Sequence, residues 1–288
     1  MDMLAQGLIQ GVLVGSTYGL IALGMGLIYS VSGVVNFAQG DMLIVALYVA
    51  LSLFAAFRFD PYVSVVVMLP IMAIAGALLY LLLIRRIMTG HAFMAVQMTL
   101  ALSFVLESSL LMIYGGDLQH VPSAYEASLL ILGNGLLVVR TSLVIAFAVS
   151  CLLSMLLYWM LNRTDLGREI RAVNQNMKAA VLMGIDVERV RTLTFAAGGA
   201  LLAIAAVLLS PGLSLSPTAG LQYTMLTIMV LVLGGMTNFF GILLGGVIIG
   251  VVEAMGGIYV SGTAGLIVPY AIFAIFLLLR PHGLLSRR

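Results

Sequence analysis

The sequence has few charged residues. Only 8% of its 288 residues are Asp, Glu, Lys or Arg, whereas a soluble globular protein contains about 25%. Apolar residues make up 62% of the chain, and the mean hydropathy is +1.19. A water-soluble fold with so little charge could not cover its surface, whereas a chain solvated by lipid tails does not need to. The composition therefore excludes a soluble globular domain and predicts a chain that lies within the bilayer.

Cysteine, lysine and histidine are also scarce. The single cysteine, Cys151, excludes an internal disulfide and any metal site built from cysteines. The single lysine, Lys178, precedes Ala179, so the chain lacks the Gly-x-x-x-x-Gly-Lys-Ser/Thr sequence whose lysine reaches nucleotide phosphates. The histidines show neither His-Glu-x-x-His spacing nor a neighbouring nucleophile; they are His91, His120 and His282. We therefore expect no catalytic residues, no metal site and no cofactor in this chain, and no enzyme activity.

Apolar runs of about 20 residues, the length needed to cross the hydrocarbon core, recur along the whole chain. They lie at about 6–28, 40–57, 62–84, 93–113, 142–161, 192–210, 240–257 and 266–280. A shorter run at about 222–235 is either a short span or a re-entrant helix. The N-terminus lacks the basic segment of a cleavable signal peptide, so the first run is expected to remain as a span. The expected fold is all-α, a polytopic membrane bundle of eight to nine spans in one domain over residues 1–288.

The basic residues predict the orientation, because Lys and Arg concentrate in cytoplasmic loops. An arrangement of nine spans, with the N-terminus outside and the C-terminus inside, places 11 of the 13 basic residues in the cytoplasm. These are Arg85, Arg86, Arg163, Arg168, Arg171, Lys178, Arg189, Arg191, Arg280, Arg287 and Arg288. Only Arg58 and Arg140 then lie outside. This arrangement requires the run at 222–235 to be a span, and we predict that it is one.

Glycines recur within two of the predicted spans. They are Gly11, Gly15, Gly19, Gly24 and Gly26 in the first span, and Gly241, Gly245, Gly246 and Gly250 in the span at 240–257. Small residues four apart lie on one helix face and let helix backbones approach closely. We expect these glycines to pack helices together; the alternative is that they leave room for a moving, water-lined path.

One polar segment, residues 162–191, interrupts the apolar pattern. It holds 6 of the 13 basic and 4 of the 11 acidic residues. Apolar residues recur within it at helical spacing, at Ala172, Val173, Met177, Ala180 and Val181. This spacing predicts a short amphipathic helix that ends at Gly184, followed by a second helix that Asp186 caps and that continues into the next span. By composition alone, the segment can equally be a connector that lies on the lipid headgroups.

The order of residues in this segment favours a protein partner. Lys178-Ala179-Ala180-Val-Leu-Met-Gly184 resembles the Glu-Ala-Ala-x-x-x-Gly pattern of the cytoplasmic coupling loop in ABC importer permeases, with lysine in place of glutamate. Alanines let a helix lie flat in a groove, and the glycine permits a sharp exit from it. We therefore expect residues 162–191 to form a cytoplasmic coupling loop.

The whole chain resembles the permease subunits of branched-chain amino acid ABC transporters, the LivH type. The similar stretches are 15–24 (GSTYGLIALG), 35–41 (VNFAQGD), 167–173 (GREIRAV), 179–186 (AAVLMGID), 232–236 (VLGGM) and 280–284 (RPHGL). The segment 36–41 and the loop at 167–186 are the most specific of these. The resemblance implies an ABC importer permease fold whose loop transmits ATP hydrolysis to the membrane. The coupling residues that it implies are Gly167, Arg168, Arg171, Lys178, Ala179, Ala180, Gly184 and Asp186.

The resemblance also implies a set of partners. Two cytoplasmic ATPase subunits would use ATP and Mg, a periplasmic binding protein would deliver the solute, and a second, related permease would complete a heterodimer. The chain would lie in the bacterial inner membrane, with lipid around it and no nucleic acid partner. Permeases of this type handle leucine-like amino acids, urea, amides and aromatic acids. Branched-chain or related amino acids are the solutes that we expect.

Polar side chains inside the spans are candidates for the translocation path or its gate. A charge at bilayer depth costs about 2.5–3.5 kcal/mol on insertion scales, so it usually faces the bundle interior. The candidates are Asn36, Gln39, Asp41, Glu107 and Glu253. We expect Asp41 at the cytoplasmic end of the second span, where a helix dipole favours an acid; a structural role and a gating role are both open. Asn36 and Gln39, with Gly33 and Gly40, form a polar break, which is tolerated at this depth only if it is buried in protein or faces water.

A secondary carrier or channel for small polar solutes is the alternative function. It would require charged residues that pair across discontinuous helices at the midplane of the membrane. Only Glu107 and Glu253 could contribute to such pairs.

Overall fold

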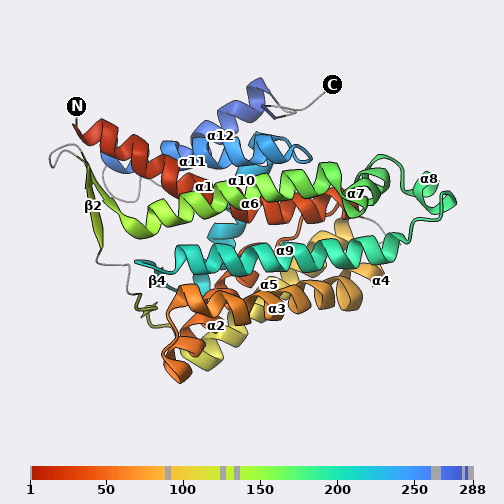
Figure 1. Ribbon diagram of the computed structural model, residues 1–288, viewed down its shortest axis with the longest axis horizontal. Helices are drawn as coiled ribbons and strands as arrows, with labels where there is room; N and C mark the ends of the chain where they lie inside the picture. Colours follow the sequence, from red (N-terminus) through yellow and green to blue (C-terminus); the bar gives the residue numbers. More distant parts are fainter. Residues whose placement is uncertain are drawn as a thin grey trace.

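The computed structural model describes residues 2–87, 92–123, 128–132, 137–260, 267–280 and 283–284. Most of these residues lie in helices along the longest axis of the molecule (Figure 1). The longer helices are α1 (Asp2–Ser32), α2 (Gln39–Phe57), α3 (Pro61–Leu78), α5 (Ala92–Tyr114), α6 (Thr141–Arg163), α9 (Val187–Leu209), α10 (Gly220–Gly234), α11 (Phe239–Tyr259) and α12 (Ile267–Leu279). A π-helical turn, η1 (Leu79–Ile84), and α4 (Arg85–Ile87) continue α3, and a 3₁₀ turn, η2 (Pro217–Ala219), precedes α10.

Short elements lie at the two ends of the bundle (Figure 1). Helices α7 (Asp165–Gln175) and α8 (Met177–Leu182) lie at one end, the α8 end. Short strands lie toward the other, the β4 end; they are β1 (Gln119–His120), β2 (Leu129–Leu132), β3 (Leu137–Arg140) and β4 (Ser214–Leu215). Strand β1 pairs antiparallel with β4, and β2 pairs antiparallel with β3.

Within the described residues, eight helices are long and apolar enough to cross a membrane. The ambiguous run at 222–235 is one of them, because η2 and α10 together form the apolar segment Pro217–Gly234 of 18 residues. Helix α12 is shorter, with 13 residues, and corresponds to the predicted span at 266–280. The polytopic helical bundle of eight to nine spans is therefore confirmed. Four residues named from the sequence fall outside the described residues: His91, His282, Arg287 and Arg288.

The two ends of the described chain lie at opposite ends of the bundle. Gln6 and Gln10 of α1 line a small cavity together with Arg140, the last residue of β3, which places the start of the chain at the β4 end. The backbone N–H of Leu284 donates to the carbonyl of Leu233, 2.9 Å away, near the end of α10. The turn after α10 lines one cavity with α7, so this last described segment lies at the α8 end. The chain therefore runs along the bundle an odd number of times, and the eight long helices together with α12 account for this.

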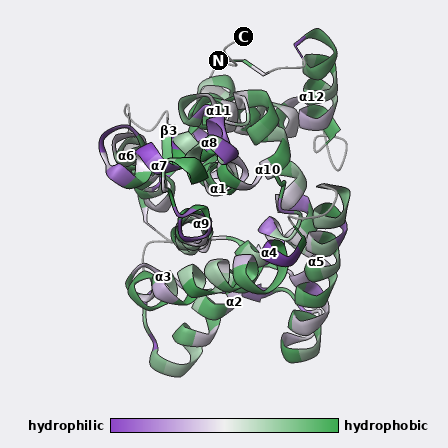
Figure 2. Ribbon diagram, turned by 90° about the vertical axis from the view of Figure 1, so that its right-hand side faces the viewer, coloured by the Kyte–Doolittle hydropathy of each residue, from purple (hydrophilic) through white to green (hydrophobic). Residues whose placement is uncertain are grey.

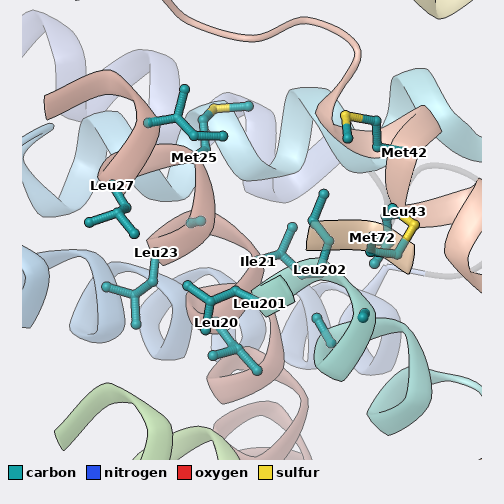
Figure 3. Packing of buried hydrophobic residues seen from close by; sticks show 14 of the residues in the cluster. Leu20, Ile21, Leu23, Met25, Leu27, Met42, Leu43, Met72, Leu201 and Leu202 are labelled. Carbon is teal, nitrogen blue, oxygen red and sulfur yellow. The ribbon is translucent and has the colours of Figure 1, made fainter. Parts of the chain in front are cut away.

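Helix α9 lies between two groups of helices, with α1, α6, α10 and α11 on one side and α2 and α3 on the other (Figure 2). Figure 3 shows Ile21 of α1, Leu43 of α2, Met72 of α3 and Leu202 of α9 close together in this core, and each is almost completely buried. Lipid tails are as apolar as these side chains, so close van der Waals packing holds the helices together rather than exclusion from water.

Helices α1 and α11 cross with glycine against glycine. A Cβ atom added to Gly15 would lie 2.5 Å from the carbonyl oxygen of Gly246, and one added to Gly250 would lie 2.4 Å from the carbonyl oxygen of Gly11. Real Cβ atoms do not approach backbone atoms this closely, so the two backbones are in direct contact only because side chains are absent. The predicted packing role is confirmed at these four glycines.

Candidate functional site

The predicted coupling loop begins with α7, which folds back against the end of α6. The hydroxyl of Thr164 caps α7 by accepting from the backbone N–H of Gly167 at 3.2 Å. A Cβ atom added to Gly167 would lie 2.2 Å from the carbonyl oxygen of Leu161, and the guanidinium of Arg171 donates to the same carbonyl. Arg168 forms an ion pair with the first residue of α7 and remains exposed. Gly167 and Arg171 therefore hold α7 against α6, whereas Arg168 faces away from the bundle.

The single amphipathic helix predicted up to Gly184 is divided in two at Asn176. This residue has extended backbone, with φ −158° and ψ 99°, and its side-chain oxygen accepts from the N–H of Ala179 at 3.1 Å. An asparagine N-cap supplies an acceptor that the first turn of a helix lacks. This local bond begins α8 as a separate helix, and the apolar spacing on which the prediction rested cannot reveal it.

Gly184 terminates α8, as predicted, and follows its last helical residue, Leu182, by two positions. Gly184 has φ of 82°, a left-handed conformation that favours glycine. The N–H of Ile185 donates to the carbonyl of Ala180 at 3.1 Å, and the N–H of Gly184 donates to that of Val181 at 3.0 Å, which together form a Schellman motif. Asp186 then accepts from the backbone N–H of Arg189 at 3.1 Å and begins α9, also as predicted. Helix α8 is therefore capped at both ends.

Helix α8 projects beyond the rest of the bundle and carries apolar side chains at its tip (Figure 1). Leu182 is 87% exposed and Met183 is 81% exposed. Lys178 and Ala179 are also exposed, whereas Ala180 is buried. The predicted apolar face is therefore only partly buried, with Val173 and Ala180 inside and Met177 and Val181 outside. Exposed apolar side chains on a helix outside the spans form a surface that a protein partner can bury.

The segment between α1 and α2, residues 33–38, is not helical and is mostly buried in the bundle. The N–H of Phe37 donates to the hydroxyl of Thr99 at 3.2 Å, and the hydroxyl of Thr224 donates to the Phe37 carbonyl at 3.1 Å. The N–H of Gly40 donates to the same Thr224 hydroxyl at 2.9 Å. Side chains of α5 and α10 thus bond the backbone groups that a broken helix leaves free, as buried backbone requires.

Asn36 and Gln39, both predicted at this break, are bonded to each other. The Nδ2 atom of Asn36 donates to Oε1 of Gln39 at 3.3 Å, and the Oδ1 atom of Asn36 accepts from the N–H of Ala38 at 3.1 Å. Gln39 lies against Gly24, two turns before the end of α1, so the chain returns into the bundle before α2 begins. The Gln39 side-chain nitrogen is buried and has no hydrogen-bond partner among the described residues. The break therefore contains one buried amide donor of Gln39 that no described residue satisfies.

Asp41 lies deeper in the bundle than the predicted cytoplasmic end of the second span. Its carboxylate accepts from the hydroxyl of Ser103, halfway along α5, and lies against the backbone of Gly220, where α10 begins. Two helix N-termini, those of α2 and α10, therefore face the carboxylate and favour its negative charge. Glu107, one turn beyond Ser103 on α5, is close enough for its charge to act on Asp41.

An apolar cavity of about 270 Å³ lies between α2, α3 and α5, and α2 and α5 are the helices that carry Asp41 and Glu107. Only apolar side chains line it. Those nearest in sequence to Asp41, Ser103 and Glu107 are Met42, Leu102 and Leu106. The apolar cavity and the polar group thus share two helices, α2 and α5.

Glu253 belongs to a second polar group on α11. Tyr18, Tyr223 and Tyr270 are all close enough to interact with its charge. One carboxylate oxygen is buried without a hydrogen-bond partner in the described part of the chain. Because Tyr223 precedes Thr224, the first turn of α10 connects this group to the break. The predicted path residues therefore form two groups, with Asn36, Gln39, Asp41 and Glu107 together and Glu253 apart.

Sequence reasoning missed several members of these groups. A signal for two of them exists, because Thr99 and Ser103 recur with Glu107 every four residues and so share one face of α5. No such local signal links Thr224 to the break, which lies more than 180 residues earlier in the chain. The described residues contain no group of His, Cys, Asp or Glu that could hold a metal ion.

Comparison with known proteins places the chain in a family. The profile described as "Branched-chain amino acid transport system / permease component" matches residues 7–277. The chain is 30% identical to the high-affinity branched-chain amino acid transport system permease protein LivH of Salmonella typhimurium, with 98% of this chain and 95% of the relative covered. It is 28% identical, with the same shares covered, to the permease protein BraD of Pseudomonas aeruginosa. A weaker similarity, 36% identity over 36% of this chain and 34% of the relative, links it to the ribose import permease RbsC of Bacillus subtilis. No solved structure matches. The chain belongs to the family of permease components of branched-chain amino acid transport systems.

Proposed function

We propose that this chain is the transmembrane permease subunit of a binding-protein-dependent ABC importer that moves branched-chain or related amino acids across the inner membrane. Helix α8 carries the proposal, because it is capped at both ends, projects from the bundle and presents an apolar tip. A short helix held in this way moves as a rigid unit, so a partner that closes on it can push or pull the spans behind it. The names of LivH and BraD, which are branched-chain amino acid permeases, support the choice of solute.

The chain itself has no nucleotide-binding loop, so the energy must come from other subunits. In the proposed assembly two cytoplasmic ATPase subunits use ATP and Mg, and a periplasmic binding protein delivers the solute. A second, related permease forms a heterodimer with this chain. The chain performs no chemical reaction of its own.

The basic residues support an orientation with the α8 end in the cytoplasm and the N-terminus outside. Arg85 forms an ion pair with Glu188 at 2.8 Å, so the end of the α3–η1–α4 segment and the start of α9 lie together. The basic residues of α4, α7, α8 and the start of α9 therefore share the α8 end, and Arg140 lies at the β4 end. Clustering of this kind is typical of the cytoplasmic side.

The buried break suits an amino acid whose side chain is aliphatic. Asp41 supplies a negative charge for an ammonium group, and Gln39 supplies an amide donor for a carboxylate. The cavity of about 270 Å³ is apolar and accommodates a branched aliphatic side chain. In this proposal the break, which Thr99 of α5 holds by one hydrogen bond and Thr224 of α10 by two, is the gate that rearranges during alternating access.

The proposal is tested by asking whether the tip of α8 binds the ATPase subunits. Leu182→Asp places a charge on the exposed tip, and Gln175→Asp places the same charge on exposed α7 as a matched control. Burying an unpaired charge at the centre of an interface costs at least about 2 kcal/mol, so Leu182→Asp should weaken ATPase binding more than about tenfold. Co-purification of the ATPase subunits from membranes, with the amount of inserted permease measured in parallel, gives the answer. Equal recovery of ATPase with Leu182→Asp, Gln175→Asp and the wild type would contradict the proposal.

A further inference from the structure

Arg191, in the second turn of α9, contacts both α8 and the interior of the bundle. Its Nε atom donates to the carbonyl oxygen of Val31 in α1 at 3.1 Å. Its NH2 group lies 3.0 Å from the sulfur of Met177, the first residue of α8. Tyr80, in the π-helical turn η1, is close enough for the Arg191 charge to act on its hydroxyl. One guanidinium thus contacts α1 and α8 and lies near η1.

The contact with Val31 lies at the end of α1, directly before the buried break. The last carbonyl groups of a helix have no partner within the helix, and a cation there also interacts favourably with the helix dipole. Val31 is in the last turn of α1, and the next turn cannot continue because Gly33 has φ of 67°. Arg191 therefore caps the helix end that fixes where residues 33–38 begin.

The contact with Met177 is of a different kind. A thioether sulfur is a weak acceptor, so this contact guides the start of α8 without fixing it rigidly. Tyr80, near the guanidinium, is itself fixed in the bundle, because it is buried and its ring packs against Phe195 of α9 at a centroid distance of 5.2 Å. Arg191 is thus held on the bundle side and only loosely on the α8 side.

We propose that Arg191 is the positioning residue through which displacement of α8 reaches the break at residues 33–38. The inference rests on the proposed function, since it presumes that ATPase subunits move α8. When α8 shifts, the distance between the Met177 sulfur and the guanidinium changes, and this alters the bond of Arg191 to the Val31 carbonyl. The end of α1 then shifts, and with it the segment that carries Asn36 and leads to Asp41.

The test uses the complete transporter in proteoliposomes, with both permeases, the ATPases and the solute-loaded binding protein. Arg191→Gln keeps a polar side chain but removes the charge and the forked donor, and Arg191→Lys keeps the charge alone. Arg189→Gln is the matched control, because Arg189 lies two residues before Arg191 near the start of α9 and its side chain is exposed. The measured quantity is solute transported per ATP hydrolysed. We expect Arg191→Gln to lower this ratio about tenfold, Arg191→Lys to recover part of the loss, and Arg189→Gln to match the wild type.

Met177→Leu keeps the apolar volume of residue 177 and removes only the sulfur contact, so it remains informative even if Arg191→Gln fails to assemble. Residues in contact show non-additive effects in double variants. We expect Met177→Leu to lower the transport ratio about threefold when Arg191 is present and to have no further effect in the Arg191→Gln background. Wild-type coupling in Met177→Leu, or in an assembled Arg191→Gln, would overturn the inference. Absence of ATP-dependent uptake in the wild-type assembly would instead contradict the proposed function, so the two failures are distinguishable.

Discussion

Gly246 of α11 lies directly against α1, and replacing it with alanine tests how closely these two helices must approach. An added Cβ atom would lie 2.4 Å from the backbone nitrogen of Gly19, 2.5 Å from its Cα and 2.6 Å from the carbonyl oxygen of Gly15. All three neighbours are backbone atoms, so no flexible side chain can move aside. Ordinary van der Waals contact begins near 3.4 Å, so α1 and α11 must separate by about 1 Å.

Gly257, on the same helix, provides a matched control, because nothing lies within 4 Å of its added Cβ atom. Both substitutions gain the higher helix propensity of alanine, up to about 1 kcal/mol, so this gain largely cancels when the two variants are compared. What remains is the cost of overpacking, typically about 1–3 kcal/mol. We therefore expect the free energy of unfolding of Gly246→Ala to lie about 1–3 kcal/mol below that of Gly257→Ala.

Unfolding of the two purified variants by denaturing detergent in mixed micelles measures this difference. Equal free energies of unfolding for Gly246→Ala and Gly257→Ala would refute the packing argument, because the cost would then not depend on the backbone contact at Gly246.

Two further predictions concern the coupling helix and the break. Gly184→Val forces a β-branched residue to φ of 82°, at a cost of about 1–3 kcal/mol. Transport-coupled ATP hydrolysis should therefore be lost while membrane insertion persists. Unchanged hydrolysis in the assembled complex would argue against α8 as the coupling element. Asp41→Ala removes the acceptor of the Ser103 hydroxyl and leaves that buried donor unpaired, so the free energy of unfolding should fall by about 1–3 kcal/mol; thermal unfolding of the purified protein measures this, and an unchanged transition would contradict a structural role for Asp41.

The spans and the helix caps could be predicted from the sequence because both are local properties. A run of apolar residues long enough to cross the bilayer needs no knowledge of its neighbours, and neither does a glycine that ends a helix or an aspartate that begins one. Gly184 and Asp186 therefore lie where the sequence placed them, at the end of α8 and the start of α9. The division at Asn176 was missed because an asparagine cap and an interior asparagine look alike when the surrounding apolar spacing continues through them.

The position of Asp41 could not be predicted, because it depends on where the chain goes after α1. The sequence shows a polar break, and its length fits either a loop at the membrane surface or a segment that returns into the bundle. The partners that bond it into the bundle, Thr99 and Thr224, come from distant helices, and a single sequence does not reveal which helices are neighbours. The contact of Arg191 with Val31, across 160 residues, was hidden for the same reason.

Uptake of a labelled branched-chain amino acid into proteoliposomes tests the central claim most directly. The measurement compares this chain alone with this chain assembled with its partner permease, the two ATPases and the binding protein, each with and without ATP. We expect uptake only in the complete assembly and only with ATP. Uptake by the lone chain without ATP would contradict it and would identify a secondary carrier or a channel.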